Sequence, residues 1–376
     1  MRTLSVVLML ALLAACGSES SPPPAKDGEV RTIDRATVTD VLSADGEMGD
    51  GPVLCTGPVR ESAPPQCEGP VISNWDWTKV WGAAGSEGAQ FGDFCFEGKN
   101  VGDTFELTTL PRPVGTCGTQ EYFARATVLE DGGTYGQAHG PQLCLGAIRL
   151  SMPPQCDGPD IPNWDWTKVS GKSQRSQTIN GLYVVHGVYV DGDFTLTRPP
   201  LEPQQFEGEV PAFELDRNFN SPCPEPDGGW FPKDRPKLDE YAVERAAPFA
   251  EKIPGYSELW LDQQFSYAKE NDPNRIILNV RVTKDVKGAE KAMRTVWQGA
   301  LCVSKAERTD AELRRIQEGA QDMAKGLMLS SSPGDDHVDM SVILDEGGRL
   351  QKAFDDKYGA GVVRVRSALS KAPPGM

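Results

Sequence analysis

The residues best suited to chemistry occur in two copies of one motif, Trp-Asp-Trp. The copies comprise Trp75, Asp76 and Trp77, and Trp164, Asp165 and Trp166. Exposed tryptophans beside a carboxylate can contact a glycan, because the rings stack on sugar and the carboxylate accepts hydrogen bonds from hydroxyls. Alternatively, the tryptophans pack a core beside a disulfide while the aspartate faces outward or caps a turn. A strand would place both tryptophans of a pair on one face, which suits either interpretation.

The two motifs belong to an internal repeat with an offset of 89 residues. Between residues 54 and 82, 20 of 29 positions are identical to residues 143–171, so the similarity is not accidental. The repeat predicts two copies of one module, at 30–115 and 120–203. Because Asp76 and Asp165 lie in different modules, nothing brings them together as an acid/base pair.

Each module is predicted to consist of short strands separated by breaks rich in Gly and Pro. No window shows a convincing apolar period of 3.6 residues, which argues against helices. Five short strands fit a small closed barrel or a sandwich, and a five-stranded OB-like barrel is the preferred form. In the second module the expected strands are Phe123–Leu129, Gln142–Arg149, Ile161–Val169, Gly181–Val190 and Asp193–Thr197.

The sequence changes character after a Pro- and Gly-rich linker at 205–235. Residues 236–376 alternate helical and strand patterns, including a capping box at Thr309 and Glu312 that begins a helix. Two βαβ units joined by a helix predict a single ferredoxin-like α+β domain. The fold class is therefore a multidomain chain, with two small all-β modules followed by an α+β domain. An Arg-rich, strand-edged face of this domain could bind a partner, although nothing singles one out.

The N-terminus is typical of an exported lipoprotein. Arg2 precedes the unbroken apolar run 4–13, which is too short to span a bilayer about 30 Å thick. Leu13-Ala14-Ala15-Cys16 resembles the lipobox of bacterial lipoproteins, a resemblance that implies lipidation of Cys16 after removal of a signal peptide at 1–15. Residues 16–29 then form a small, polar, Pro-rich disordered tether. We expect a location on the extracytoplasmic face of a cell membrane, held there by lipid.

Export makes disulfides the default for the eight cysteines that remain after Cys16 is set aside. Each module has its own Cys-x11-Cys, which predicts Cys55–Cys67 and Cys144–Cys156. Cys95 and Cys117 occur only in the first copy, and two cysteines gained together most simply pair with each other. Elimination leaves Cys223 and Cys302 as the fourth pair.

The net charge of the chain bears on which classes of partner it can bind. The net charge is −16, which argues against nucleic acid and against electrostatic binding to anionic lipid. No second apolar run is long enough to cross a membrane. The expected partners are the membrane through the N-terminal lipid and an envelope glycan or a secreted protein.

Other patterns give no catalytic, cofactor or metal site. His139, His186 and His337 are widely spaced and lack partner motifs, so structural or surface roles are expected. No Gly-rich phosphate loop, nucleophile elbow or His-Glu-x-x-His is present. Acidic clusters at Asp45-Gly46-Glu47 with Asp50, and at Asp191-Gly192-Asp193, lack the full calcium-ligand spacing and are expected to be solvated turns.

The chain also bears two resemblances to known families. The repeated Cys, Pro-Pro-Gln-Cys and Trp-Asp-Trp pattern, with Leu278-Asn279-Val280-Arg281-Val282 and Gly299-Ala300-Leu301-Cys302-Val303, resembles a family of uncharacterised actinobacterial lipoproteins. That resemblance implies the architecture and no activity. Trp260-Leu261-Asp262, the strand 275–282, the segment 301–303 and the helix from Thr309 are similar to the pro-domains of streptogrisin and alpha-lytic-type serine proteases, over about 110 residues. No Gly-Asp-Ser-Gly-like protease sequence follows.

These observations favour a lipid-anchored binding or interaction protein without catalytic activity. One alternative is a cell-envelope hydrolase, or a carbohydrate-binding protein that uses the Trp-Asp-Trp motifs. Another is an inhibitor or chaperone of a secreted protease that acts through the C-terminal domain.

The lipid anchor is tested by Cys16→Ala, which removes the thiol that would carry the diacylglyceryl group. We expect the variant to leave the membrane fraction or to retain its signal peptide, because two acyl chains are needed for stable anchoring. Membrane fractionation and the mass of the N-terminal peptide measure both effects. A variant that fractionates and migrates like the wild type would contradict the assignment.

Overall fold

The computed structural model describes residues 26–40, 51–60, 62, 65–86, 89–132, 139–209, 218–265 and 272–373. The chain divides into two compact units, residues 1–117 and 118–376. The expected signal peptide, Cys16 and the acidic cluster at residues 45–50 lie outside the described residues. Of the expected tether, only residues 26–29 are described.

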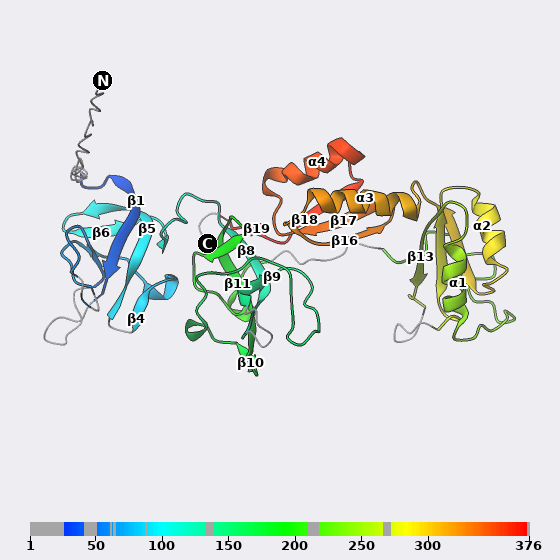
Figure 1. Ribbon diagram of the computed structural model, residues 1–376, viewed down its shortest axis with the longest axis horizontal. Helices are drawn as coiled ribbons and strands as arrows, with labels where there is room; N and C mark the ends of the chain where they lie inside the picture. Colours follow the sequence, from blue (N-terminus) through cyan, green and yellow to red (C-terminus); the bar gives the residue numbers. More distant parts are fainter. Residues whose placement is uncertain are drawn as a thin grey trace, which may run out of the picture. The chain divides into compact units, whose positions relative to one another are not determined.

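The first unit is a ring of strands (Figure 1). Its elements are β1 Val30–Thr39, β2 Val53–Leu54, β3 Val71–Ile72, the 3-10 helix η1 Trp77–Lys79, β4 Ala84–Ser86, β5 Ala89–Val101, β6 Thr104–Leu107 and β7 Arg112–Pro113. β1 pairs with β2, β2 with β3, β3 in parallel with β6, β6 with β5, and β5 again with β1. These pairings close five strands on themselves, while β4 and β7 add to β5. Closure removes the free edges that an open sheet would expose.

The core of this ring is small and aromatic. Its buried residues are Val38, Leu54, Ile72, Val80, Ala83, Phe94, Phe96 and Phe105. Alternate residues of β5 point inward, as the period of a strand requires. Gly98 lies so close to the Phe105 ring that any Cβ would collide with it, which accounts for glycine at this position.

The second unit begins with the second copy of the same ring. Its elements are β8 Tyr122–Asp131, β9 His139–Cys144, the 3-10 helix η2 Trp166–Lys168, β10 Ser173–Arg175, β11 Thr178–Val190, β12 Asp193–Leu196 and the 3-10 helix η3 Pro203–Gln205. β8 pairs with β9 and β11, and β11 pairs with β12. Single bridges at Asp160, to Gln142 and in parallel to Asp193, stand where β3 stands in the first ring.

The inward positions of the two rings follow the sequence offset. Leu143, Ile161, Tyr183, Val185 and Phe194 are buried in the second ring. Each lies 89 residues after a buried residue of the first ring, and Gly187 again approaches a phenylalanine ring, that of Phe194. The repeat therefore determines the same inward face in both copies.

The C-terminal region corrects one expectation: it contains two three-stranded sheets rather than the single sheet of a ferredoxin-like domain. The first half comprises α1 Ala242–Ala250, β13 Tyr256–Asp262, β14 Ile277–Val282, α2 Val286–Met293 and β15 Ala300–Lys305. The second comprises α3 Asp310–Met323, β16 Met328–Gly334, β17 His337–Val342, the 3-10 helix η5 Glu346–Gly348, α4 Arg349–Tyr358 and β18 Val363–Ser367. In each half the first two strands are antiparallel and the third is parallel to the second.

The two halves thus repeat one order, helix, strand, strand, helix, strand, each around its own core. In the first, Trp297, Met293 and the inward side chains of β14 pack with the helices. In the second, Val338, Met340 and Val342 of β17 pack against residues of α3 and α4. Strand β16 was not predicted from the sequence, because Ser330, Ser331 and Ser332 give it no apolar alternation.

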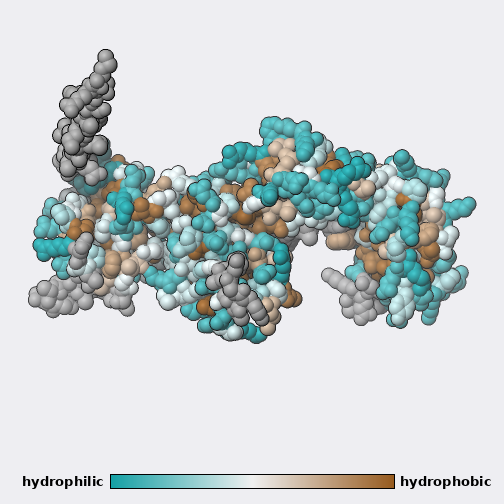
Figure 2. Space-filling model, in the orientation of Figure 1, coloured by the Kyte–Doolittle hydropathy of each residue, from teal (hydrophilic) through white to brown (hydrophobic). Residues whose placement is uncertain are grey.

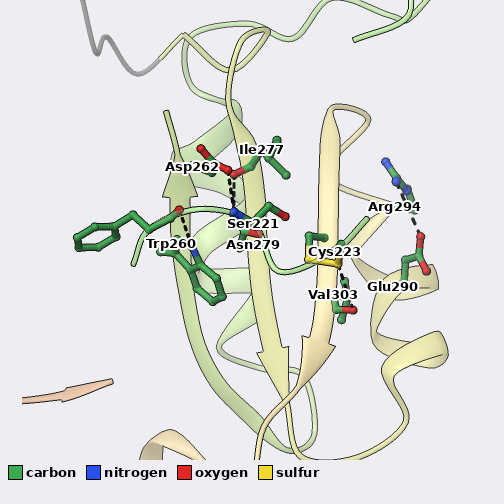
Figure 3. The surroundings of a disulfide bond; sticks show 11 residues. Ser221, Cys223, Trp260, Asp262, Ile277, Asn279, Glu290, Arg294 and Val303 are labelled. Atoms are coloured by element: carbon green, nitrogen blue, oxygen red, sulfur yellow. Dashed lines mark hydrogen bonds and ion pairs between the residues drawn. A yellow bond between two sulfur atoms is a disulfide. The ribbon is translucent and has the colours of Figure 1, made fainter. Parts of the chain in front are cut away.

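The Pro-rich linker covers the face of the first sheet that its helices leave free (Figure 3). Cys223 is bonded to Cys302 of β15, and Trp230 and Phe231 pack on the same cluster. The backbone N–H of Ser221 donates to Asp262 over 2.7 Å, at the end of β13. The linker is therefore part of this half rather than a free hinge.

The end of the chain returns to the second β-module. The short strand β19, Ser370–Lys371, pairs antiparallel with Phe123 and Tyr122 of β8. The N–H of Ala372 donates to the carbonyl of Glu121 over 2.9 Å. This closing strand was not expected from the sequence, and it ties the last described residues of the chain to the second module.

Hydrophilic residues predominate on the face shown in Figure 2, with hydrophobic residues in small separate patches. Within the described residues, no helix is both long and apolar enough to cross a membrane.

The bridge that holds the linker can be tested by Cys223→Ala with Cys302→Ala. These cysteines lie 79 residues apart, so the chain-entropy model gives a loss of about 4 to 5 kcal/mol in the free energy of unfolding. Urea unfolding followed by tryptophan fluorescence measures it. In the control, Cys95→Ala with Cys117→Ala, the loss of about 3 kcal/mol should be confined to the first unit. A loss below about 1 kcal/mol in the test variant would contradict the role assigned to the linker.

Candidate functional site

The Trp-Asp-Trp segments form capped turns, so the strand predicted over Ile161–Val169 is wrong. Asp165 precedes η2, and its Oδ1 accepts hydrogen bonds from the Thr167 N–H at 2.8 Å and the Thr167 hydroxyl at 2.6 Å. Asp76 does the same with Thr78 before η1, at 3.0 and 2.5 Å. These hydrogen bonds lower the pKa of both aspartates. A side chain that bonds the backbone two residues ahead favours a turn over a strand, which accounts for the difference.

The tryptophans pack against the barrel cores. The ring centroids of Trp75 and Trp77 lie 5.0 Å apart, and Trp75 meets Phe94 edge to face at 5.4 Å. In the second module Trp164 lies 5.1 Å from both Trp166 and Tyr183. All four tryptophans are only half-buried. The packing supports the structural interpretation of the motifs, and glycan contact through these six residues stays a prediction.

One indole nitrogen in each pair is fixed by a carboxylate. Trp77 Nε1 donates to Asp40 over 3.1 Å, and Trp166 Nε1 donates to Glu130 over 2.5 Å. Asp40 directly follows β1 and Glu130 lies near the end of β8, the first strands of their modules, so the same tie recurs in both copies. It orients the second tryptophan of each motif.

The cysteines are paired as predicted. The Cα–Cα distances are 5.4 Å for Cys55–Cys67, 6.0 Å for Cys95–Cys117, 5.4 Å for Cys144–Cys156 and 5.7 Å for Cys223–Cys302. Two bridges therefore lie within single modules at equivalent positions. Figure 3 shows the fourth, which joins the linker to β15.

His186 lies inside the second module. It is 4% exposed, and its ring stacks on Phe123 with centroids 5.7 Å apart. Burial, with the nearby Arg198 cation, lowers its pKa to about 4. Glu121 forms a buried ion pair with Arg198 and accepts a hydrogen bond from Thr197. This polar group supports the barrel wall where β19 attaches.

His337 begins β17 in the second half of the C-terminal region. Its Nδ1 lies 2.9 Å from the carbonyl of Asp335 and its Nε2 lies 3.1 Å from Asp339 Oδ2. The hydrogen bond to Asp339 raises the His337 pKa. Both ring nitrogens are thus engaged, one by a backbone carbonyl and the other by a carboxylate.

A pocket of about 230 Å³ lies on the strands of the second sheet, and Asp339, the hydrogen-bond partner of His337, is part of its lining. Its described lining is Ser330, Ser331, Ser332, Asp339, Met340, Ser341 and Arg366. Arg366 lies 3.8 Å from Asp339, so the charges of these two lining residues offset each other. From the sequence an Arg-rich, strand-edged face was expected without a location, and the serines of this pocket were not expected. Among the described residues, no cluster of three or more His, Cys, Asp or Glu side chains could hold a metal.

The loop stapled by Cys144–Cys156 carries the two most exposed large apolar side chains of the described residues. Leu150 has a relative exposure of 102% and Met152 of 91%, while the next highest value is 56%. The Arg149 N–H donates to the Gln155 carbonyl over 2.8 Å, directly below the tip. The Ser151 hydroxyl donates to the carbonyl of Pro153 over 2.7 Å. The tip is therefore held in shape while its apolar side chains point into solvent.

The first module holds its equivalent loop in the same way. Cys55–Cys67 closes the base, and the Arg60 N–H donates to the Gln66 carbonyl over 2.9 Å. Residues 61, 63 and 64 at the tip lie outside the described residues. From the sequence, the Pro-Pro-Gln-Cys segments were assigned only as disulfide anchors. The signal that could have revealed the exposed tip is the alternation of Ile148, Leu150 and Met152 in a loop that has no core to face.

Compared with known proteins, the chain matches no family model and no curated protein.

His186 gives a pH prediction. The folded protein holds its pKa near 4 whereas the unfolded value is about 6.5, so only the unfolded chain binds a proton between these values. The free energy of unfolding should therefore fall by about 3 kcal/mol as the pH drops from 6.5 to 4, and should be unaffected by this group above 6.5.

The test compares denaturant unfolding of the wild type and His186→Phe from about pH 7 to about pH 4. The variant keeps an aromatic ring against Phe123 but removes the titrating group, so its stability should fall less on acidification. Contributions from carboxylates are shared by both proteins and cancel in the difference. Parallel stability profiles for the two proteins would refute the assignment.

Proposed function

We propose that this protein is a lipid-anchored, extracytoplasmic interaction protein without catalytic activity, and that the stapled loop of the second module is its binding element. One observation carries the proposal: Leu150 and Met152 are presented fully to solvent on a loop fixed by a disulfide and by backbone hydrogen bonds. Exposed apolar side chains on a conformationally constrained loop are typical of a surface that binds another protein.

The energetics favour binding through this loop. Burying a leucine or methionine side chain fully is worth about 1.5 to 3 kcal/mol. In the free protein neither Leu150 nor Met152 contributes this burial free energy. A partner that buries both side chains gains it on binding. Because the loop is already ordered, little conformational entropy is lost on association.

The architecture supports a binding role. We propose that the two rings of strands are OB-like barrels, since the parallel pairing of β3 with β6 and the return of β5 to β1 follow the expected five-stranded closure. Such barrels use loops and strand faces as binding surfaces. The lipid anchor at Cys16 and the family of actinobacterial lipoproteins inferred from the sequence belong to the same proposal.

The alternatives have less support. A hydrolase would need an activated nucleophile, and the two nitrogens of His337 are instead bonded to Asp335 and Asp339. A glycan-binding face would need open indole rings, and the tryptophans pack edge to face within their modules. A secreted protein is therefore the favoured partner.

The test places a photo-crosslinking amino acid at position 150 or, as a control, at position 182 in the intact lipoprotein in its host. Leu182 is also exposed, at 42%, and lies on β11 of the same module. We expect one discrete adduct from position 150 that is abolished by excess disulfide-closed peptide covering residues 144–156. Equal adducts from both positions, or none from position 150, would mean that the loop is not the binding element.

A further inference from the structure

Residues 147–151 of the stapled loop contain no turn or bend, and the chain bends only after them, at Met152 and Pro153. Arg149 turns toward Asp157, with which it forms an ion pair at 3.4 Å, and the Ser151 hydroxyl turns toward Pro153. Leu150 and Met152, the residues between and after them, point into solvent. Successive side chains of an extended segment face opposite sides, so the loop presents one apolar side chain at every second position.

An extended segment with a protruding side chain is the form in which endopeptidases bind polypeptides. The chain lies across the active site as an added strand, and one side chain enters a specificity pocket beside the bond that is attacked. A segment that binds in this way but is held rigid acts as an inhibitor, because its binding loses little entropy. Here the rigidity comes from Cys144–Cys156, from the Arg149–Gln155 hydrogen bond and from two successive prolines.

The residue that would enter the pocket follows from the chemistry of the next bond. The amide after Met152 is formed with Pro153, whose nitrogen carries no hydrogen and whose ring fills the leaving-group side. Leu150 precedes Ser151, with which it forms an ordinary secondary amide beside a small side chain. Leu150 also follows directly after Arg149, whose backbone is hydrogen-bonded, so its position is the more firmly fixed of the two.

We propose that the loop Leu145–Gln155 is a substrate-like inhibitor of a serine endopeptidase with an apolar specificity pocket, and that Leu150 occupies that pocket. The inference rests on the proposed function and names its partner class. An apolar slot accepts leucine, whereas a pocket with an aspartate at its base selects lysine or arginine. This differs from inhibition through the C-terminal region, because the loop belongs to the second β-module.

The complex needs no covalent step. If the enzyme does hydrolyse the bond between Leu150 and Ser151, one water is added, giving a carboxylate on Leu150 and an amine on Ser151. The two ends stay joined through Cys144–Cys156, so the cut protein remains one molecule. Its mass increases by one water, and the masses of the two fragments released by reduction and denaturation show which bond the enzyme cut.

The experiment uses the full mature chain carrying Cys16→Ser, so that it is free of membrane, with chymotrypsin and trypsin as probes of an apolar and an acidic pocket. Inhibition constants are measured for this protein and for the same protein with Leu150→Arg. We expect inhibition of chymotrypsin to weaken by at least about 30-fold in the variant, and inhibition of trypsin to appear. Leu182→Arg, which introduces the same charge elsewhere on the module, should change neither.

A second variant tests whether the rigidity of the loop protects it from cleavage. Cys144→Ser with Cys156→Ser loosens the loop, and we expect this variant to be cleaved by chymotrypsin after Leu150 faster than the bridged protein. Circular dichroism and a map of the other three disulfides establish that each variant is folded.

The proposal is overturned if the folded protein inhibits neither enzyme, or if Leu150→Arg and Leu182→Arg have the same effect. Such a result, together with a specific cross-link at position 150 to a protein that is not a protease, would leave the proposed binding function in place and reject only the partner class.

Discussion

The constraint on which the two β-modules depend is the disulfide between the second strand and the Pro-Pro loop. Each module has fewer than ninety residues and a core of only a few buried aliphatic and aromatic side chains, a size at which apolar burial alone leaves little stability. Cys55–Cys67 and Cys144–Cys156 join residues 12 apart in sequence, and each removes about 3 kcal/mol of chain entropy from the unfolded state. The same disulfide also constrains the loop that extends away from the core. One bond therefore contributes both to the stability of the module and to the shape of its loop.

Those features of the two modules that depend on local or duplicated sequence signals could be predicted from the sequence. The offset of 89 residues predicted equivalent inward positions, such as Phe105 and Phe194. Cysteine counting predicted all four bridges, because each copy supplies its own pair and the remaining cysteines allow few combinations. The structure adds the ring closure, which depends on strand pairs distant in sequence, such as Val71 with Thr104.

The failures have physical reasons. Two βαβ patterns do not reveal whether their strands join one sheet or two, since that depends on long-range pairing. The decisive strand, β16, has a polar Ser-rich sequence that gives no strand signal. The Trp-Asp-Trp segment alternates like a strand, but the Asp165 carboxylate bonds Thr167 and bends the chain into a 3-10 turn. The exposed tip was not predicted, because alternating apolar residues in a loop were indistinguishable from a short strand without knowledge of their exposure.

Duplication gives the proposed inhibitor a further property. The scaffold of the loop is the same in both modules: the bridge, the bonded Arg and Gln pair and the two prolines all recur. The position of Leu150 is taken in the first module by Glu61, whose own structure lies outside the described residues. A specificity pocket that accepts leucine rejects a carboxylate, because an unpaired charge would be buried there. In this scaffold a change of the one side chain at the position of Leu150 would therefore change selectivity, while the bonds that hold the loop are retained.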